Sequence, residues 1–178
     1  MKRIKFFSRV AICLIASSAL LSVNVNAQKL TDPEIASVAV TANQIDIDYA
    51  HIAQTKSKNK EVIAFAQTMA KDHQAVIDKA VALVTKLGVT PKTNATTKAF
   101  LKGETKTKAV LNSKSGRAFD KAYVDNEVAY HKAAINEVEN VLIPNSTNGE
   151  LKSLLQSAVP LFKAHLAHAE MVQKHISK

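Results

Sequence analysis

Three histidines in this chain stand in otherwise apolar helical patterns and are the residues best placed to do chemistry. His73, His131 and His165 each occupy a position where apolar residues recur every three or four residues, the spacing of one buried helix face. A buried imidazole without a partner is costly, so these side chains must bond one another, hold water or hold a metal ion. Neutral imidazole together with carboxylate suits iron, zinc, copper or manganese. The pattern therefore supports the hypothesis of a buried transition-metal site.

Two carboxylates and a fourth histidine could complete such a site. Asp46 borders the apolar stripe of the first predicted helix, Glu127 precedes His131 by one turn, and His168 follows His165 by one turn. The candidate metal ligands are thus Asp46, His73, Glu127, His131, His165 and His168. The alternative is a hydrogen-bonded polar core that fixes packing and holds no metal. The residue types alone leave both interpretations open, and no catalytic residue is assigned.

Four long helices are predicted to carry these residues. Capping residues, apolar periodicity and glycine or proline breaks place them at about residues 32–56, 60–87, 116–143 and 149–176. Asp32 is expected to cap the first helix, the third is expected to end before Pro144, and the fourth is expected to continue across Pro160 with a kink.

The candidate ligands are predicted to lie at one height in the bundle. Asp46, His73, His131 and His165 each lie about 13 to 15 residues from the start of their helix, or about 20 Å along it. Each of the four helices therefore offers a polar side chain near its middle.

The connection between the second and third long helices is itself informative. Residues 89–115 are rich in threonine and lysine, and residues 99–111 are predicted to form a short helix. A connection of this length can cross the whole bundle, whereas the break at residues 57–59 forces an antiparallel pair. We therefore expect an all-α, ferritin-like four-helix bundle with one long crossover that carries a short extra helix. The lysines of segment 92–114 are either a solvated surface or a contact with an anionic envelope surface.

The first 27 residues have the pattern of a cleaved signal peptide. Basic residues precede an apolar run at 10–21, and Val25-Asn26-Ala27 offers small residues for cleavage. The alternative is an uncleaved anchor. We expect a leader at 1–27 and a domain at 28–178, exported to the periplasm or associated with the outer membrane. The only cysteine, Cys13, lies in the leader, so the mature chain has no thiolate site.

Charge and motifs exclude several classes of protein. Four of the 24 basic residues lie in the leader, so the mature chain keeps an excess of five positive charges, too diffuse for nucleic-acid binding. A glycine-rich phosphate loop, a nucleophile elbow and a zinc-protease signature are all missing from the sequence. Neither a monomer nor a homodimer is favoured.

Several short blocks resemble a bacterial ferritin-like family whose domain has no known function. The resemblance spans about residues 30–176 and rests on Ala66, Met69, Asp72-His73, Phe119-Asp120, Tyr123, His131, Leu161 and His165-Leu166. Members are often labelled putative or predicted outer-membrane proteins. The resemblance implies a ferritin-like four-helix fold and an exported location, and it supplies no established activity.

The chain departs from the ligand pattern of di-iron proteins. Those proteins carry Glu-x-x-His motifs on two helices, but Ala70, Val128 and Phe162 stand three residues before the three histidines. This favours a single metal, or none, over a ferroxidase centre. Our first hypothesis is therefore a non-enzymatic, exported envelope protein that binds a transition metal through its mid-bundle side chains. The alternatives are a structural or interaction module without metal, and an iron- or peroxide-dependent oxidoreductase.

Overall fold

The computed structural model describes residues 29–177, in which the chain forms helices and loops and no strand. The helices are α1 (Asp32–Lys56), α2 (Lys60–Lys86), α3 (Ala95–Asn112), α4 (Gly116–Glu137), the π-helix η1 (Val138–Leu142), α5 (Ile143–Asn145) and α6 (Gly149–Ile176). The prediction of an all-α fold is confirmed for this part of the chain. The predicted signal peptide, residues 1–27, lies outside the described residues.

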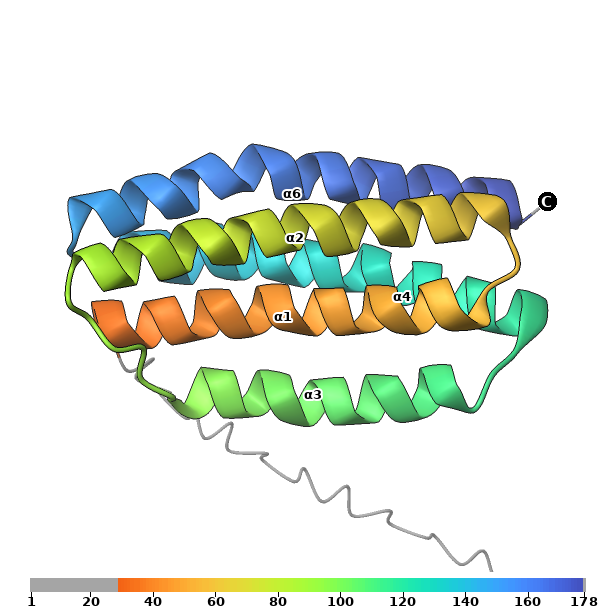
Figure 1. Cartoon of the computed structure of the whole chain (residues 1–178), viewed down its shortest axis with the longest axis horizontal. Coiled ribbons are helices and arrows are strands. Elements are labelled where there is room, and N and C mark those ends of the chain that lie inside the picture. Colours follow the sequence, from red (N-terminus) through yellow and green to blue (C-terminus); the bar gives the residue numbers. More distant parts are fainter. Residues whose placement is uncertain (1–28, 178) are drawn as a thin grey trace, which may run out of the picture.

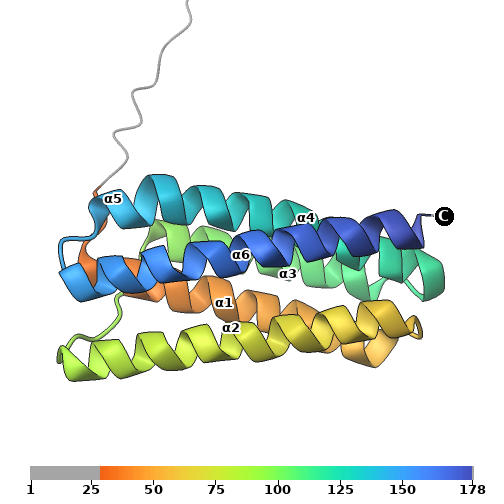
Figure 2. The same ribbon diagram turned by 90° about the horizontal axis from the view of Figure 1, so that it is seen from above.

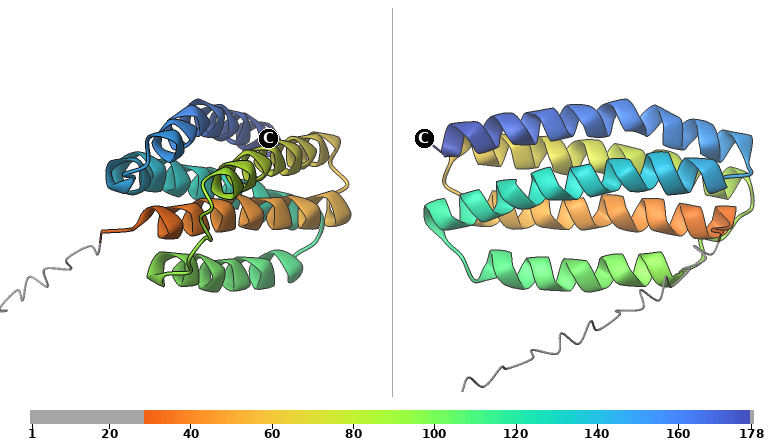
Figure 3. Two further views of the ribbon diagram at one scale, coloured as in Figure 1. Left: turned by 60° about the vertical axis from the view of Figure 1, so that its left-hand side comes forward. Right: turned by 180° about the vertical axis from the view of Figure 1, so that it is seen from behind.

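Helices α1, α2, α4 and α6 lie side by side along one long axis (Figures 1 and 2), and α3 lies on the outer side of α1 (Figure 1). Helix α2 runs back along α1, and α3 then carries the chain to the opposite end of the bundle (Figure 1). Helix α4 therefore points the same way as α2, and α6 returns beside it. The same order is visible from behind (Figure 3).

Side-chain caps start the helices close to where the sequence predicts. Asn59 and Asn148 accept hydrogen bonds from the first free N–H groups of α2 and α6. Helix α3 begins four residues earlier than predicted, because the Asn94 side chain accepts from the Thr97 N–H at 3.0 Å. At the end of α2, Gly88 has a φ of 63°, a left-handed conformation that suits glycine.

The predicted role of Asp32 as a cap of its own helix is wrong. The carboxylate of Glu34 instead accepts from the Thr31 N–H at the start of α1. Asp32 turns across to the start of α6, where it accepts from the backbone N–H of Thr147 at 2.9 Å and of Asn148 at 3.0 Å. It therefore ties the first helix to the last.

The predicted helix end before Pro144 is also wrong. Pro144 has no N–H and its ring clashes with the carbonyl four residues earlier, which usually ends an α-helix. Here the chain widens into η1 instead, where the Ile143 N–H donates to the Val138 carbonyl five residues back. The helical path then continues through α5. Helix α6 continues across Pro160, as predicted.

Two apolar clusters fill the interior, one in each half of the bundle. One is built around Phe65, Met69 and Tyr123. The other is built around Leu155 and Phe162, with further residues from α1, α4 and η1. Along α2, α4 and α6 the three histidines fall between the residues of the two clusters, so a polar layer divides the core. Within residues 29–177 no helix is long and apolar enough to span a bilayer.

Candidate metal centre

Five of the six predicted ligands meet in this polar layer. Asp46 comes from α1, His73 from α2, Glu127 and His131 from α4, and His165 from α6. All five are buried, with 0 to 3% of each residue exposed. The mid-helix heights predicted from the sequence therefore do place the side chains together.

The sixth predicted ligand, His168, is placed apart from them. It is half-buried, and its ring meets the edge of Phe65 with centroids 5.0 Å apart. It belongs to neither of the two groups of side chains that could share an ion in the described residues.

One ring nitrogen of His73 is held by an amide. Asn43 donates its Nδ2 to the Ala39 carbonyl at 2.8 Å, which turns its Oδ1 toward His73. That oxygen lies 2.7 Å from Nδ1 of His73. An amide oxygen only accepts, so Nδ1 carries the proton and Nε2 keeps its lone pair.

His131 is held in the same way by its own helix. Its Nδ1 lies 3.0 Å from the Glu127 carbonyl oxygen, one turn earlier in α4. A carbonyl can only accept, so Nδ1 is again the protonated nitrogen and Nε2 is again free.

His165 is held by a carboxylate at the edge of the layer. Its Nε2 lies 3.0 Å from Oδ2 of Asp72, whose side chain is 31% exposed. The Nδ1 of His165 is buried and has no hydrogen-bond partner among the described residues. Each of the three imidazoles is thus anchored through one nitrogen, an arrangement typical of histidines that bind metal through the other.

The free nitrogens and one carboxylate oxygen converge. The Nε2 atoms of His73 and His131 are 3.4 Å apart, and Asp46 Oδ2 lies 3.6 Å from the first and 3.7 Å from the second. Two ligands that are each about 2.1 Å from one tetrahedral ion are about 3.4 Å apart. These separations fit a shared ion better than direct hydrogen bonds, and His165 also offers a nitrogen within 4.8 Å of the other two histidines.

The two carboxyl groups are buried next to each other. None of the four side-chain oxygens of Asp46 and Glu127 accepts a hydrogen bond from an N–H or hydroxyl group of the described residues, so the available partner is the other carboxyl, when one of the two is protonated. Burial raises the pKa of Asp46 to about 7. Burial and the neighbouring charge of Asp46 raise the pKa of Glu127 well above its usual range.

The pKa values of the three imidazoles shift in the opposite direction from those of the two carboxyls. Burial lowers the pKa of His131 to about 4 and the pKa of His73 well below its usual range. The pKa of His165 is also lowered by burial, against the opposing effect of Asp72. All three rings are therefore neutral near pH 7, which is the form that binds metal.

Chemically, the layer offers imidazole nitrogens and carboxylate oxygens. The donor set is three histidines with one or two carboxylates, which suits Cu(II), Zn(II), Fe(II) or Mn(II). The buried carboxyl oxygens and the unpartnered His165 nitrogen are groups that a bound cation would satisfy. The residues therefore fit a metal ion.

Sequence reasoning missed two residues that anchor the histidines. Asn43 lies one turn before Asp46 on α1, and an amide one turn from a candidate ligand is a signal that could have identified it. Asp72 directly precedes His73 in the sequence, but its hydrogen-bond partner is His165 on another helix. That contact depends on how α2 and α6 pack, which helical periodicity does not fix.

Comparison with protein families places the chain in a family without an assigned function. Residues 19–172 match the model of DUF4142, a domain of unknown function, and the chain belongs to this family. No curated protein matches the chain. Among solved structures, the chain is similar to CopM in the Cu(II)-bound form. That match has a TM-score of 0.62 and 16% identity, and it covers 82% of this chain and 98% of CopM, so it supports a shared fold.

Proposed function

We propose that this protein binds a transition-metal ion in its polar layer. His73, His131 and Asp46 would be the principal ligands, and His165 and Glu127 would complete the site. The observation that carries the proposal is the convergence of anchored imidazoles, with the two Nε2 atoms 3.4 Å apart and Asp46 Oδ2 within 3.7 Å of both.

A metal-free structural role for this layer accounts less well for the same contacts. Both Nδ1 atoms face acceptors, so a hydrogen bond between the two Nε2 atoms would require one ring to carry a second proton. Burial lowers the pKa of both rings and opposes that proton. Without an ion, the two Nε2 lone pairs therefore face each other at 3.4 Å.

Copper is the ion we propose to test first. Nitrogen and oxygen ligands suit Cu(II), which also binds most tightly among the divalent first-row metals. The similar fold of CopM, whose structure holds Cu(II), supports the choice. Iron, zinc and manganese remain the alternatives.

We further propose a ferritin-like bundle that serves as an exported binding protein. Support comes from the mid-bundle ligands, the crossover through α3 and the leader pattern of residues 1–27. An oxidoreductase that uses iron or peroxide is the alternative, and it is weakened by the missing Glu-x-x-His motifs. Mass analysis of the protein from the periplasmic fraction would test export, with cleavage after Ala27 as the expected result.

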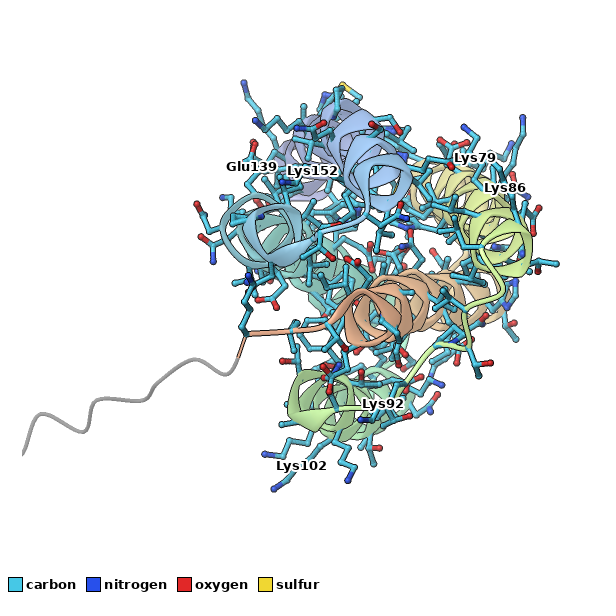
Figure 4. The ribbon with its side chains drawn as sticks, turned by 90° about the vertical axis from the view of Figure 1, so that its left-hand side faces the viewer. Lys79, Lys86, Lys92, Lys102, Glu139 and Lys152 are labelled. Atoms are coloured by element: carbon cyan, nitrogen blue, oxygen red, sulfur yellow. The ribbon has the colours of Figure 1, made fainter. Side chains whose placement is uncertain are left out.

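The outer face of α3 is the surface we propose for loose contact with the anionic envelope. Lys98, Lys102 and Lys106 are exposed on it, whereas Lys108 is paired with Asp48 and Glu104. Lys102 extends away from the bundle (Figure 4). Such a contact would weaken as ionic strength rises.

Elemental analysis tests the metal proposal. The chain from Gln28, without a histidine tag, is incubated with each of the four metals, desalted and analysed. We expect close to one ion per chain, lost in His73→Ala and His131→Ala but kept in His51→Ala, which removes an exposed histidine. Circular dichroism checks that each variant is folded. Metal no higher than background in the wild type, or full loading of both folded core variants, would reject the proposal.

A further inference from the structure

A second feature of the interior lies beside the polar layer. A cavity of about 50 Å³ occupies the half of the bundle that contains the cluster around Leu155 and Phe162. It is bordered by α1, α2, α4, η1 and α6, with Phe100 of α3 also on its wall. Its inner end reaches Asn43 and the His73 ring.

Small side chains leave this space unfilled. Six alanines from four helices line it, where larger side chains would meet in a close-packed core: Ala36, Ala39, Ala42, Ala80, Ala134 and Ala158. The widened turn of η1 contributes Val138 and Leu142 to the same wall. The cavity therefore results from the small residues on several helices and from the widened turn of η1, and not from a single poorly packed contact.

The wall offers almost nothing to water. A buried water needs two to four polar partners. The Asn43 amide is already committed to Ala39 and His73, and Nδ1 of His73 is committed to Asn43. Tyr130 is also on the wall, and its hydroxyl donates to the Ala42 carbonyl at 2.8 Å. Glu137, the other titratable side chain there besides His73, is half-buried, with a pKa raised by burial. Apolar cavities of this kind stay dry and bind apolar guests; one of about 150 Å³ takes benzene or xenon.

We propose that this cavity binds small apolar molecules of the size of dioxygen and holds them against the His73 ring. About 50 Å³ admits a molecule of a few heavy atoms. The site does not depend on a bound metal. If the polar layer does hold a metal through His73, the cavity would bring dioxygen next to one of its ligands, which bears directly on the oxidoreductase alternative.

Xenon and dioxygen serve as the two probes, applied to the metal-free mature chain under gas pressure. Methyl NMR is recorded for the valine, isoleucine and leucine side chains. We expect saturable xenon shifts and paramagnetic dioxygen relaxation that are concentrated at Val38, Ile77 and Leu155, which line the cavity. Shifts spread evenly over the protein, or absent from these methyl groups, would overturn the proposal.

Variants that fill and enlarge the cavity decide between binding and nonspecific contact. Ala80→Leu should reduce the xenon shifts several-fold, whereas Ala82→Leu, the same change on the exposed face of α2, should leave them unchanged. Leu155→Ala enlarges the cavity and should increase xenon occupancy at the remaining lining methyl groups. Unchanged xenon binding in both Ala80→Leu and Leu155→Ala would refute the assignment. Because no metal is present, this result is separate from that of the metal-binding experiment.

Discussion

Asp46 illustrates the conflict between stability and binding at the scale of single residues. Its carboxyl is fully buried beside Glu127, and neither oxygen accepts a hydrogen bond from an N–H or hydroxyl group of the described residues. Groups held in this way usually cost stability and are kept for function. We expect Asp46→Asn to raise the free energy of unfolding of the metal-free protein by about 1 kcal/mol at pH 8 while weakening metal binding at least tenfold. Urea denaturation and metal titration measure the two effects. A folded variant that is less stable and binds metal normally would contradict this account.

The pH dependence of stability follows from the same groups. Above pH 6.5 the histidines are neutral in the folded protein and lose their remaining protons in the unfolded chain. The raised pKa values of Asp46 and Glu127 mean that the folded protein keeps protons that the unfolded chain has released, and this effect is the larger of the two. Stability of the metal-free protein should therefore fall as pH rises from about 6.5 to 8. Below pH 6.5 the three histidines bind protons in the unfolded chain but not in the folded protein, because their pKa values are lowered on folding. The protons taken up by the three imidazoles on unfolding outnumber those released by the two carboxyls. The free energy of unfolding should therefore fall again as the pH drops toward about 4.5.

Denaturation across this pH range, compared between wild type and Asp46→Asn, measures the effect. We expect a maximum near pH 6.5 in the wild type and a flatter alkaline limb in the variant. A wild-type stability that rises steadily from pH 6.5 to 8 would show that the carboxyls do not hold their protons in the folded state.

At the scale of the elements, Asp32 joins the start of α1 to the start of α6. Its carboxylate accepts from two backbone N–H groups and from the hydroxyls of Ser146 and Thr147. Hydrogen bonds to a charged group contribute about 1.5–3 kcal/mol, and this group is partly exposed. We expect Asp32→Ala to lower the free energy of unfolding by about 1–2 kcal/mol, measured in urea. Glu34→Ala, which removes only a local contact at the start of α1, is the control and should cost less. Equal losses of stability in the two variants would argue against a stabilising contact between Asp32 and the start of α6.

The elements also show how far the sequence predicts this protein. Periodicity and caps locate the four long helices, and the mid-helix positions of His73, His131 and His165 suffice to predict a shared polar layer. Periodicity does not reveal η1, because a proline more often ends a helix than widens it. Periodicity also does not reveal that Asp72 forms a hydrogen bond with His165, or that alanines on four helices line a cavity, because both features depend on how the helices pack.

At the scale of the whole molecule, an ion in the polar layer would connect α1, α2, α4 and α6 at their centre. A ligand that binds only the folded state stabilises it by about 2.7 kcal/mol at a concentration one hundred times its Kd. For a domain of this size that corresponds to a rise in Tm of about 5–10 °C. Calorimetry with and without Cu(II) should show this rise in the wild type and lose it in His131→Ala. The same rise in folded His131→Ala would place the ion elsewhere.

The position of the ion is the most direct test of the central claim. A crystal structure of the copper-loaded mature chain, with anomalous data collected on both sides of the copper absorption edge, would locate it. The account predicts one strong copper peak in the polar layer, bounded by His73, His131 and Asp46. A peak only at surface histidines such as His51 or His175, or an empty polar layer in a crystal grown with excess Cu(II), would contradict it.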